Sequence, residues 1–224
     1  MTTLLALDTA TECCSAALLH DGAVTARSEV IPRQHAQRLL PMIEELLGER
    51  QLRLQDVDAL VFGRGPGAFT GVRIATGMVQ GLAFAADKPV IAVSNLAALA
   101  QRAWREHGTD TVAAAIDARM DEVYWGLYGR QDGVMQLLDD ERVCAPEAVS
   151  LPAGVGSVAG AGTGWQYAER LAVSATQSWP QMLPDASDLI TLALPRWQAG
   201  EVVDAADAQP VYLRDKVATP KGQA

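Results

Sequence analysis

The segment 4–18 reads LLALDTATECCSAAL, and its pattern returns at residues 113–127 as AAAIDARMDEVYWGL. In both copies an apolar run ends in an aspartate, Asp8 or Asp117, and a short turn leads to a second apolar run. Short apolar runs bounded by turn residues are typical of buried strands. Two copies of one strand–turn–strand unit therefore predict a chain with an internal duplication.

Strands and helices are expected to alternate through the rest of the first half. Residues 11–22 and 23–30 should form two strands joined by the turn Asp21-Gly22. Apolar residues at helical spacing predict a helix over 34–47, with Gly48 as its stop. The remaining elements expected here are strand 56–62, helix 70–86, strand 89–94 and helix 95–108, with Asn95 as the cap and Gly108 as the stop of the last helix.

The second half continues the repeat with a third strand over 133–140 and a glycine-rich turn over 156–165. A helix over 187–200 is expected to be interrupted at Pro195, and the polar chain beyond Leu213 is expected to fray. We therefore predict a duplicated α/β fold of mixed sheets flanked by helices, with a reduced second half. The predicted division is into residues 1–108 and 109–224.

The charge of the chain is unfavourable for direct binding to nucleic acid. The 224 residues are 49% hydrophobic, which is enough for a sizeable core. Lys and Arg number 18 against 27 Asp and Glu, a net charge of −9. Such a chain lacks the general attraction for phosphate backbones on which nucleic-acid binders depend. We expect RNA to meet this protein only through a partner.

The three cysteines, Cys13, Cys14 and Cys144, form no motif for zinc and indicate free thiols in a reducing compartment. The first residues include no charged leader, and no apolar run approaches the roughly 18 residues of a membrane span. We expect a cytoplasmic protein without membrane contact.

Residues 63–77, GRGPGAFTGVRIATG, have the glycine content of a phosphate-binding loop without its pattern. Gly71 is not followed by the lysine that a Walker A loop requires. A formal match to the dinucleotide-binding pattern at Gly63, Gly65 and Ala68 lacks the acidic residue expected after the next strand. The glycines therefore favour a tight turn and close packing over a grip on phosphate.

Gly77 and Gly81 lie four residues apart on one face of the expected helix 70–86. Each costs a helix interior about 1 kcal/mol relative to alanine. A face kept this flat predicts close approach by another helix, with Val72, Val79 and Leu82 adding apolar contact. The alternative is that this face packs only within its own domain.

The histidines, His20, His35 and His107, share no helix face, and the residue four after His35 is Leu39. A helical metal site commonly needs two histidines at that spacing. We therefore expect no metal site and no catalytic residue. A peptidase is disfavoured as well, since no serine, cysteine and histidine stand at a recognisable spacing.

Four segments together resemble the TsaB family. They are ALDTATECCSAAL at 6–18, QHAQRLLPMIEELL at 34–47, GRGPGAFTGVRIATGMVQGLAF at 63–84 and PVYLRDKVA at 210–218. The resemblance runs from the first strand to near the C-terminus, and GPGAFTGVRIA is its most distinctive part. It implies the actin-like ATPase (ribonuclease H-like) fold, in agreement with the duplication.

The TsaB family supplies a subunit of the bacterial machinery that makes threonylcarbamoyladenosine in tRNA. The resemblance implies pairing with TsaD, which transfers the threonylcarbamoyl group to N6 of an adenosine beside the anticodon, and association with the ATPase TsaE. It also implies a homodimer when the chain is alone, through the same surface. That surface is expected to include His35, Arg38, Leu39, Met42, Ile43, Leu46, Thr70, Arg73, Ile74, Gly77, Met78 and Gly81.

In this fold class, two aspartate-bearing turns face each other across a nucleotide cleft beside a glycine-rich turn. The residues of this chain at those positions are Asp8, Thr9, Asp117, Gly160, Gly162 and Gly164. Arg119 and Met120 replace the small residues that let backbone amides reach a phosphate. The alternative is that both aspartates only end strands and bond to local turns.

The leading hypothesis is a non-catalytic scaffold that requires no cofactor. The competing hypothesis from the enzyme class is an ATPase or kinase that binds ATP or ADP, alone or within the complex. A peptidase acting on TsaD has the least support in the sequence.

Overall fold

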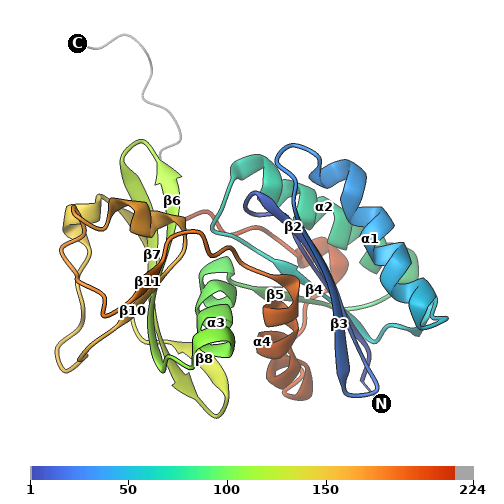
Figure 1. Cartoon of the computed structure of the whole chain (residues 1–224). Helices are drawn as coiled ribbons and strands as arrows, with labels where there is room; N and C mark the ends of the chain where they lie inside the picture. The colour runs from blue at the N-terminus through green and yellow to red at the C-terminus, as the bar shows by residue number, and fades with distance from the viewer. Residues whose placement is uncertain (1, 215–224) are drawn as a thin grey trace, which may run out of the picture.

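The chain forms two mixed sheets, and the computed structural model describes residues 2–214 (Figure 1). The first sheet has the strand order β3-β2-β1-β4-β5. Its strands are β1 (Leu4–Asp8), β2 (Cys13–His20), β3 (Ala23–Val30), β4 (Ala59–Gly63) and β5 (Val90–Val93). The order of the second sheet is β8-β7-β6-β10-β11, with β9 also paired to β7. Its strands are β6 (Thr111–Arg119), β7 (Glu122–Gln131), β8 (Val134–Leu137), β9 (Arg142–Cys144), β10 (Ala159–Ala161) and β11 (Ser178–Trp179).

The two sheets repeat one topology, which confirms the predicted duplication. In the first, β2 pairs antiparallel with β1 and β3, while β4 pairs parallel with β1 and β5. In the second, β7 pairs antiparallel with β6 and β8, while β10 pairs parallel with β6 and β11. Asp8 lies opposite Ser15 in β2, and Asp117 lies opposite Val123 in β7. The fold is therefore the duplicated actin-like, ribonuclease H-like arrangement expected from the sequence.

Four α-helices are unevenly shared between the sheets. The helices α1 (His35–Glu49) and α2 (Phe69–Ala86) cover the outer face of the first sheet, and α3 (Asn95–His107) and α4 (Ala186–Gln198) fill the space between the sheets (Figure 1). Around the second sheet the chain forms short 3-10 helices, at 146–148 and 163–167, where the first half has α1 and α2. The second half is therefore reduced. No helix within residues 2–214 has the length and apolar character needed to span a membrane.

One core joins the two halves. Leu4 and Ala6 of β1 face α4, while the alternate residues Leu5 and Leu7 face α1 and α2, as the period of a strand requires. The core on the α4 side continues through α3 to Ile116 of the second sheet. Because α4 comes from the second half but packs on the first sheet, the division between residues 108 and 109 stays a prediction.

Three local expectations were wrong. Gly48 does not stop α1, which continues through it to Glu49 with Arg50 as the C-cap. Ser94, not Asn95, caps α3, since its Oγ accepts bonds from the amides of Leu96 and Ala97. Helix α4 continues through Pro195 to Gln198. Proline removes only one backbone donor near the helix end, and Arg196 anchors the last turn by donating to the carbonyl of Ala92 at 2.8 Å. Gly108 ends α3 with a φ of 69°, as expected, and the expected frayed tail lies outside the described residues beyond 214.

The glycine-rich segment 63–77, which we call the glycine loop, packs directly against the turn between β1 and β2. A Cβ added at Gly71 would lie 2.0 Å from the carbonyl oxygen of Thr9, and one at Gly67 would lie 2.3 Å from that of Ala10. Two hydrogen bonds form across this contact. The Ala68 amide donates to Ala10 O at 2.7 Å, and the Thr9 hydroxyl donates to Gly71 O at 2.7 Å. These glycines therefore serve backbone-to-backbone packing.

Asp8 ends β1 in a fully buried site under this loop. Its Oδ1 accepts from Asn95 Nδ2 at 2.7 Å and from the Ala10 amide at 3.3 Å, and Asn95 Oδ1 accepts from the Gly65 amide at 2.8 Å. Its Oδ2 has no hydrogen-bond partner within the described chain. Burial raises the pKa of Asp8 from 3.8 to about 6, against the lowering effect of the Asn95 bond.

Substitutions at two glycines of α2 should have opposite effects on stability. Gly71→Ala should lower the free energy of unfolding by roughly 2–4 kcal/mol, because the new methyl group collides with backbone that cannot move independently. Gly77→Ala, in the same helix but with open space around it, should raise it by about 1 kcal/mol. Urea unfolding of the two variants tests the contrast. Equal effects would contradict the packing role of Gly71.

Because the pKa of Asp8 is raised, Asp8→Asn should increase the free energy of unfolding by an amount that grows with pH. Between the unfolded pKa of 3.8 and the folded value of about 6, the folded state holds the extra proton, so ionisation of Asp8 lowers stability as the pH rises. The difference in unfolding free energy between variant and wild type should grow by up to about 3 kcal/mol from pH 4 to pH 8. Denaturant titrations across this range measure it, with the exposed Asp87→Asn as the control for the substitution itself. A constant difference would contradict the burial argument.

Candidate functional site

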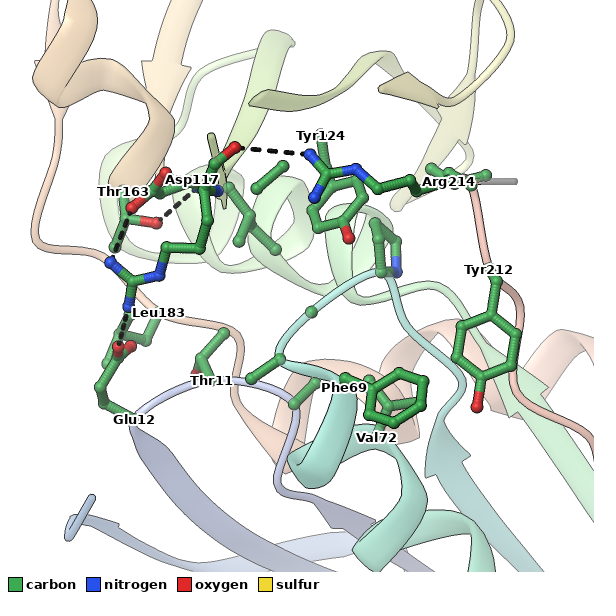
Figure 2. A pocket seen from close by; sticks show the side chains of 18 of the residues that line it. Thr11, Glu12, Phe69, Val72, Asp117, Tyr124, Thr163, Leu183, Tyr212 and Arg214 are labelled. Atoms are coloured by element: carbon green, nitrogen blue, oxygen red, sulfur yellow. Dashed lines mark hydrogen bonds and ion pairs between the residues drawn. The ribbon is translucent and has the colours of Figure 1, made fainter. Parts of the chain in front are cut away.

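A cavity of about 980 Å³ lies between the two halves of the molecule (Figure 2). Its walls come from the β1–β2 turn, the β6–β7 turn, the start of α2 and the end of the described chain. The charged and aromatic residues that line it include Glu12, Phe69, Arg73, Asp117, Arg119 and Tyr212. The duplication therefore places a cavity between two equivalent turns, one from each half.

The last described residues close one side of this cavity by linking both halves. Gln80 of α2 donates to Ala208 O at 2.9 Å, and the Val211 amide donates to Arg64 O at 2.8 Å. Arg214 then forms an ion pair with Glu122 at the start of β7. Residues 208–214 thus run from the first sheet to the second and supply a wall of the cavity.

A polar cluster occupies the side of the cavity near the β6–β7 turn (Figure 2). Arg119 pairs with Asp117 at 3.1 Å and reaches across to Glu12 of the first half at 3.8 Å. The Asp117 amide donates to Thr163 Oγ1 at 3.0 Å, and Tyr167 donates to Asp117 Oδ1 at 3.3 Å. Asp117 is therefore held by its own half and neutralised by Arg119.

An aromatic cluster occupies the side near α2 (Figure 2). The guanidinium carbon of Arg73 lies 3.5 Å from the centroid of the Phe69 ring, and Arg73 Nε donates to the Tyr212 hydroxyl at 3.0 Å. The two rings are 5.9 Å apart. Phe69 and Tyr212 were not predicted as site residues, and no local pattern joins two residues so far apart in the chain.

Three amides at or beside the two turns donate within the chain. The Ala10 and Arg119 amides donate to Asp8 Oδ1 and Asp117 Oδ1 respectively, and the Cys13 amide donates to Thr11 Oγ1 at 3.3 Å. A phosphate cradle needs several such amides directed at one point. The two aspartates therefore end their strands and stabilise the local turns, in agreement with the alternative stated from the sequence.

Of the six residues expected at a nucleotide cleft, only Asp117 lines the cavity. The other five, Asp8, Thr9, Gly160, Gly162 and Gly164, do not line it, which corrects the expected cleft. Asp8 and Thr9 are fully buried. A Cβ on any of the three glycines would collide with Trp165, Ala115 or Leu99, so these glycines serve packing against β6 and α3.

The expected pairing surface needs a correction on α1. Leu39, Met42, Ile43 and Leu46 are at most 1% exposed and belong to the core under the first sheet, so they offer no surface to a partner. His35 is buried as well, at 7% exposure. The same holds for Val72 and Val79 of α2. The apolar stripe of α1 faces the sheet that it covers, as that of an amphipathic surface helix does.

The remaining predicted pairing residues leave a surface, mostly on α2. Thr70, Arg73, Gly77 and Gly81 are exposed, and Arg38, Ile74 and Met78 are partly exposed. No heavy atom lies within 4 Å of a Cβ placed at Gly77 or Gly81. Two exposed apolar residues were missed: Phe84, 85% exposed one turn beyond Gly81, and Leu40 of α1. The spacing of Phe84 from Gly81 was the available signal.

Within residues 2–214, no three His, Cys, Asp or Glu side chains are grouped so that they could hold a metal ion. The histidines lie apart: His20 contacts Thr3, His35 is buried in α1, and His107 stacks on Trp179 with centroids 3.9 Å apart.

Known proteins match this chain over nearly its whole length. The tRNA threonylcarbamoyladenosine biosynthesis protein TsaB of Escherichia coli strain K12 is 45% identical over 97% of both chains. The protein of the same description from Haemophilus influenzae is 42% identical over 98% of this chain and 96% of its own. The solved structure of YeaZ from Pseudomonas aeruginosa is 59% identical, with a TM-score of 0.93 over 95% of this chain and 100% of that one.

A family model described as "TsaD: tRNA N6-adenosine threonylcarbamoyltransferase" matches residues 26–193. The chain therefore belongs to the TsaB family of tRNA threonylcarbamoyladenosine biosynthesis proteins, which is related to TsaD.

Proposed function

We propose that this chain is a non-catalytic scaffold subunit that pairs with TsaD and, together with TsaE, supports transfer of threonylcarbamoyl to N6 of an adenosine in tRNA. The observation that carries the proposal is the exposed face of α2. Gly77 and Gly81 leave it without side chains, and Ile74 and Met78 flank it as partly exposed apolar residues.

The energetic cost of this face supports a role in pairing. Two exposed glycines in the middle of α2 cost about 2 kcal/mol relative to alanine, and no contact within the described chain requires them. Flat helix faces allow another helix to approach closely, so that flanking side chains bury more area. Apolar burial contributes about 25 cal/mol per Å² before the ordering costs of association.

The partner of this face is TsaD in the complex and a second copy of this chain when TsaD is absent. Leu40 of α1 and Phe84 at the end of α2 extend the apolar area on either side. Arg38 forms ion pairs with Glu29 and Glu45 and would contribute to the rim of the interface.

We place the protein in the cytoplasm, where tRNA is modified. We assign contact with tRNA to the partner, because this chain carries a net charge of −9.

The scaffold role requires no cofactor. The Ala10 and Arg119 amides of the two turns are engaged within the chain, and the cavity presents Glu12 and Asp117 beside Arg119. Binding of ATP or ADP by the complex would place the nucleotide partly on the partner.

Gly77→Leu and Gly81→Leu should each block pairing while the monomer stays folded, because both positions have open space around them. Analytical ultracentrifugation with TsaD, and of the chain alone, measures association, and circular dichroism checks the fold. The control is Gln198→Leu, which adds the same side chain at an exposed site on α4. Unchanged association of the glycine variants would rule out this face as the pairing surface.

Titration calorimetry of the isolated chain with ATP or ADP should show no binding at concentrations up to about 1 mM, since the Ala10, Cys13 and Arg119 amides already donate within the chain and Glu12 and Asp117 add negative charge to the cavity. Saturable binding in the micromolar range would instead favour the enzyme hypothesis.

A further inference from the structure

The interlobe cavity contains one arginine without a carboxylate partner in the described chain. Three arginines line the cavity. Arg119 pairs with Asp117, and Arg214 pairs with Glu122. Arg73 forms no ion pair within residues 2–214, although the protein as a whole has an excess of carboxylates. A single positive charge therefore remains available inside a cavity of about 980 Å³.

Arg73 is held in one orientation by two aromatic residues. Its guanidinium stacks on Phe69 at 3.5 Å from the centroid, and its Nε donates to the Tyr212 hydroxyl at 3.0 Å. These contacts leave the two terminal nitrogens without an acceptor among the described residues. A guanidinium that presents its terminal N–H groups in a fixed plane matches the two oxygens of a carboxylate. Because the side chain is already ordered, binding costs less conformational entropy.

The uncharged part of the cavity wall is mainly apolar. Val72, Ile116, Leu183 and Val211 line the same cavity. Phe69 and Tyr212 remain 49% and 46% exposed, so their rings are available for stacking. Helix α2 begins at Phe69, which adds the positive end of its dipole at this wall.

The negative charges of the cavity lie on its other side. Figure 2 shows Glu12 and Asp117 across the cavity from Phe69 and Tyr212. A polyphosphate would bring several negative charges to one unpaired arginine and would extend toward these two acids. A single carboxylate group can pair with Arg73, and an apolar body attached to it brings no further negative charge toward Glu12 and Asp117.

We propose that this cavity binds a small molecule with an apolar, ring-bearing body and one carboxylate group, and that Arg73 receives the carboxylate. The body lies along Val72 and Leu183 and stacks on the exposed aromatic rings. Arg73 belongs both to the exposed residues of α2 and to the cavity lining, but the proposed ligand binding is a property of this chain alone and does not depend on the scaffold role.

The test compares two probes that share the phenyl ring and its ethylene chain and differ in the end group, a carboxylate in 3-phenylpropionate and a hydroxymethyl group in 3-phenylpropan-1-ol, by calorimetry and ligand-observed NMR with the full chain. The acid should bind with a dissociation constant on the order of millimolar. It should bind about tenfold more tightly than the alcohol, since bonds to charged groups contribute roughly 1.5–3 kcal/mol. Arg73→Gln should abolish this preference and leave binding of the alcohol unchanged. Tyr212→Phe should reduce the preference by a few fold, because it keeps the ring and frees the guanidinium.

The matched control is Arg53→Gln, an exposed arginine beside Asp56 that does not line the cavity. It should keep the full preference for the acid. Equal binding of acid and alcohol to the wild type would overturn the ligand class. A preference that survives in Arg73→Gln would overturn the role of Arg73, and no binding of either probe at tens of millimolar would overturn the site.

Discussion

The contact between the glycine loop and the β1–β2 turn is the constraint on which the rest of the structure depends. Backbone meets backbone there, because a side chain at Gly67 or Gly71 would occupy the positions of Ala10 O and Thr9 O. This contact fixes where α2 starts and therefore which of its faces is turned outward. It also buries Asp8, whose carboxyl group joins the end of β1 to Asn95 at the start of α3. Both the pairing surface and the cavity wall follow from the placement of α2.

The duplicated fold could be predicted from the sequence because each sheet begins with the same local pattern, an apolar strand, an aspartate and a turn. The exposed face of α2, on which we propose pairing, could be predicted only in part. Helical periodicity shows that Leu39 and Ile43 share a face with each other, but it cannot show whether that face meets the sheet or a partner. The lining of the cavity could not be predicted, because Glu12, Arg119 and Tyr212 are brought together only by the tertiary fold.

The reduction of the second half explains how its glycine-rich turn is used. Without helices like α1 and α2, the second sheet fills its own surface with Trp165, which packs against Gly160 and donates to Ala113 O at 2.8 Å. The glycine-rich turn is therefore used in packing. Residues 208–214 close the remaining opening and bring Tyr212 to Arg73. What remains is a mainly apolar cavity between two sheets of the same topology, and a helix face that carries the proposed pairing function.

The central claim is that the exposed face of α2 lets this chain support TsaD without chemistry of its own. Reconstitution of tRNA modification from purified TsaD, TsaE, tRNA and the threonylcarbamoyl adenylate tests it most directly, with and without this chain. The account predicts that modification depends on the wild-type chain, and that Gly77→Leu fails to support it although it is folded. Full modification without the chain, or with Gly77→Leu in its place, would contradict the account.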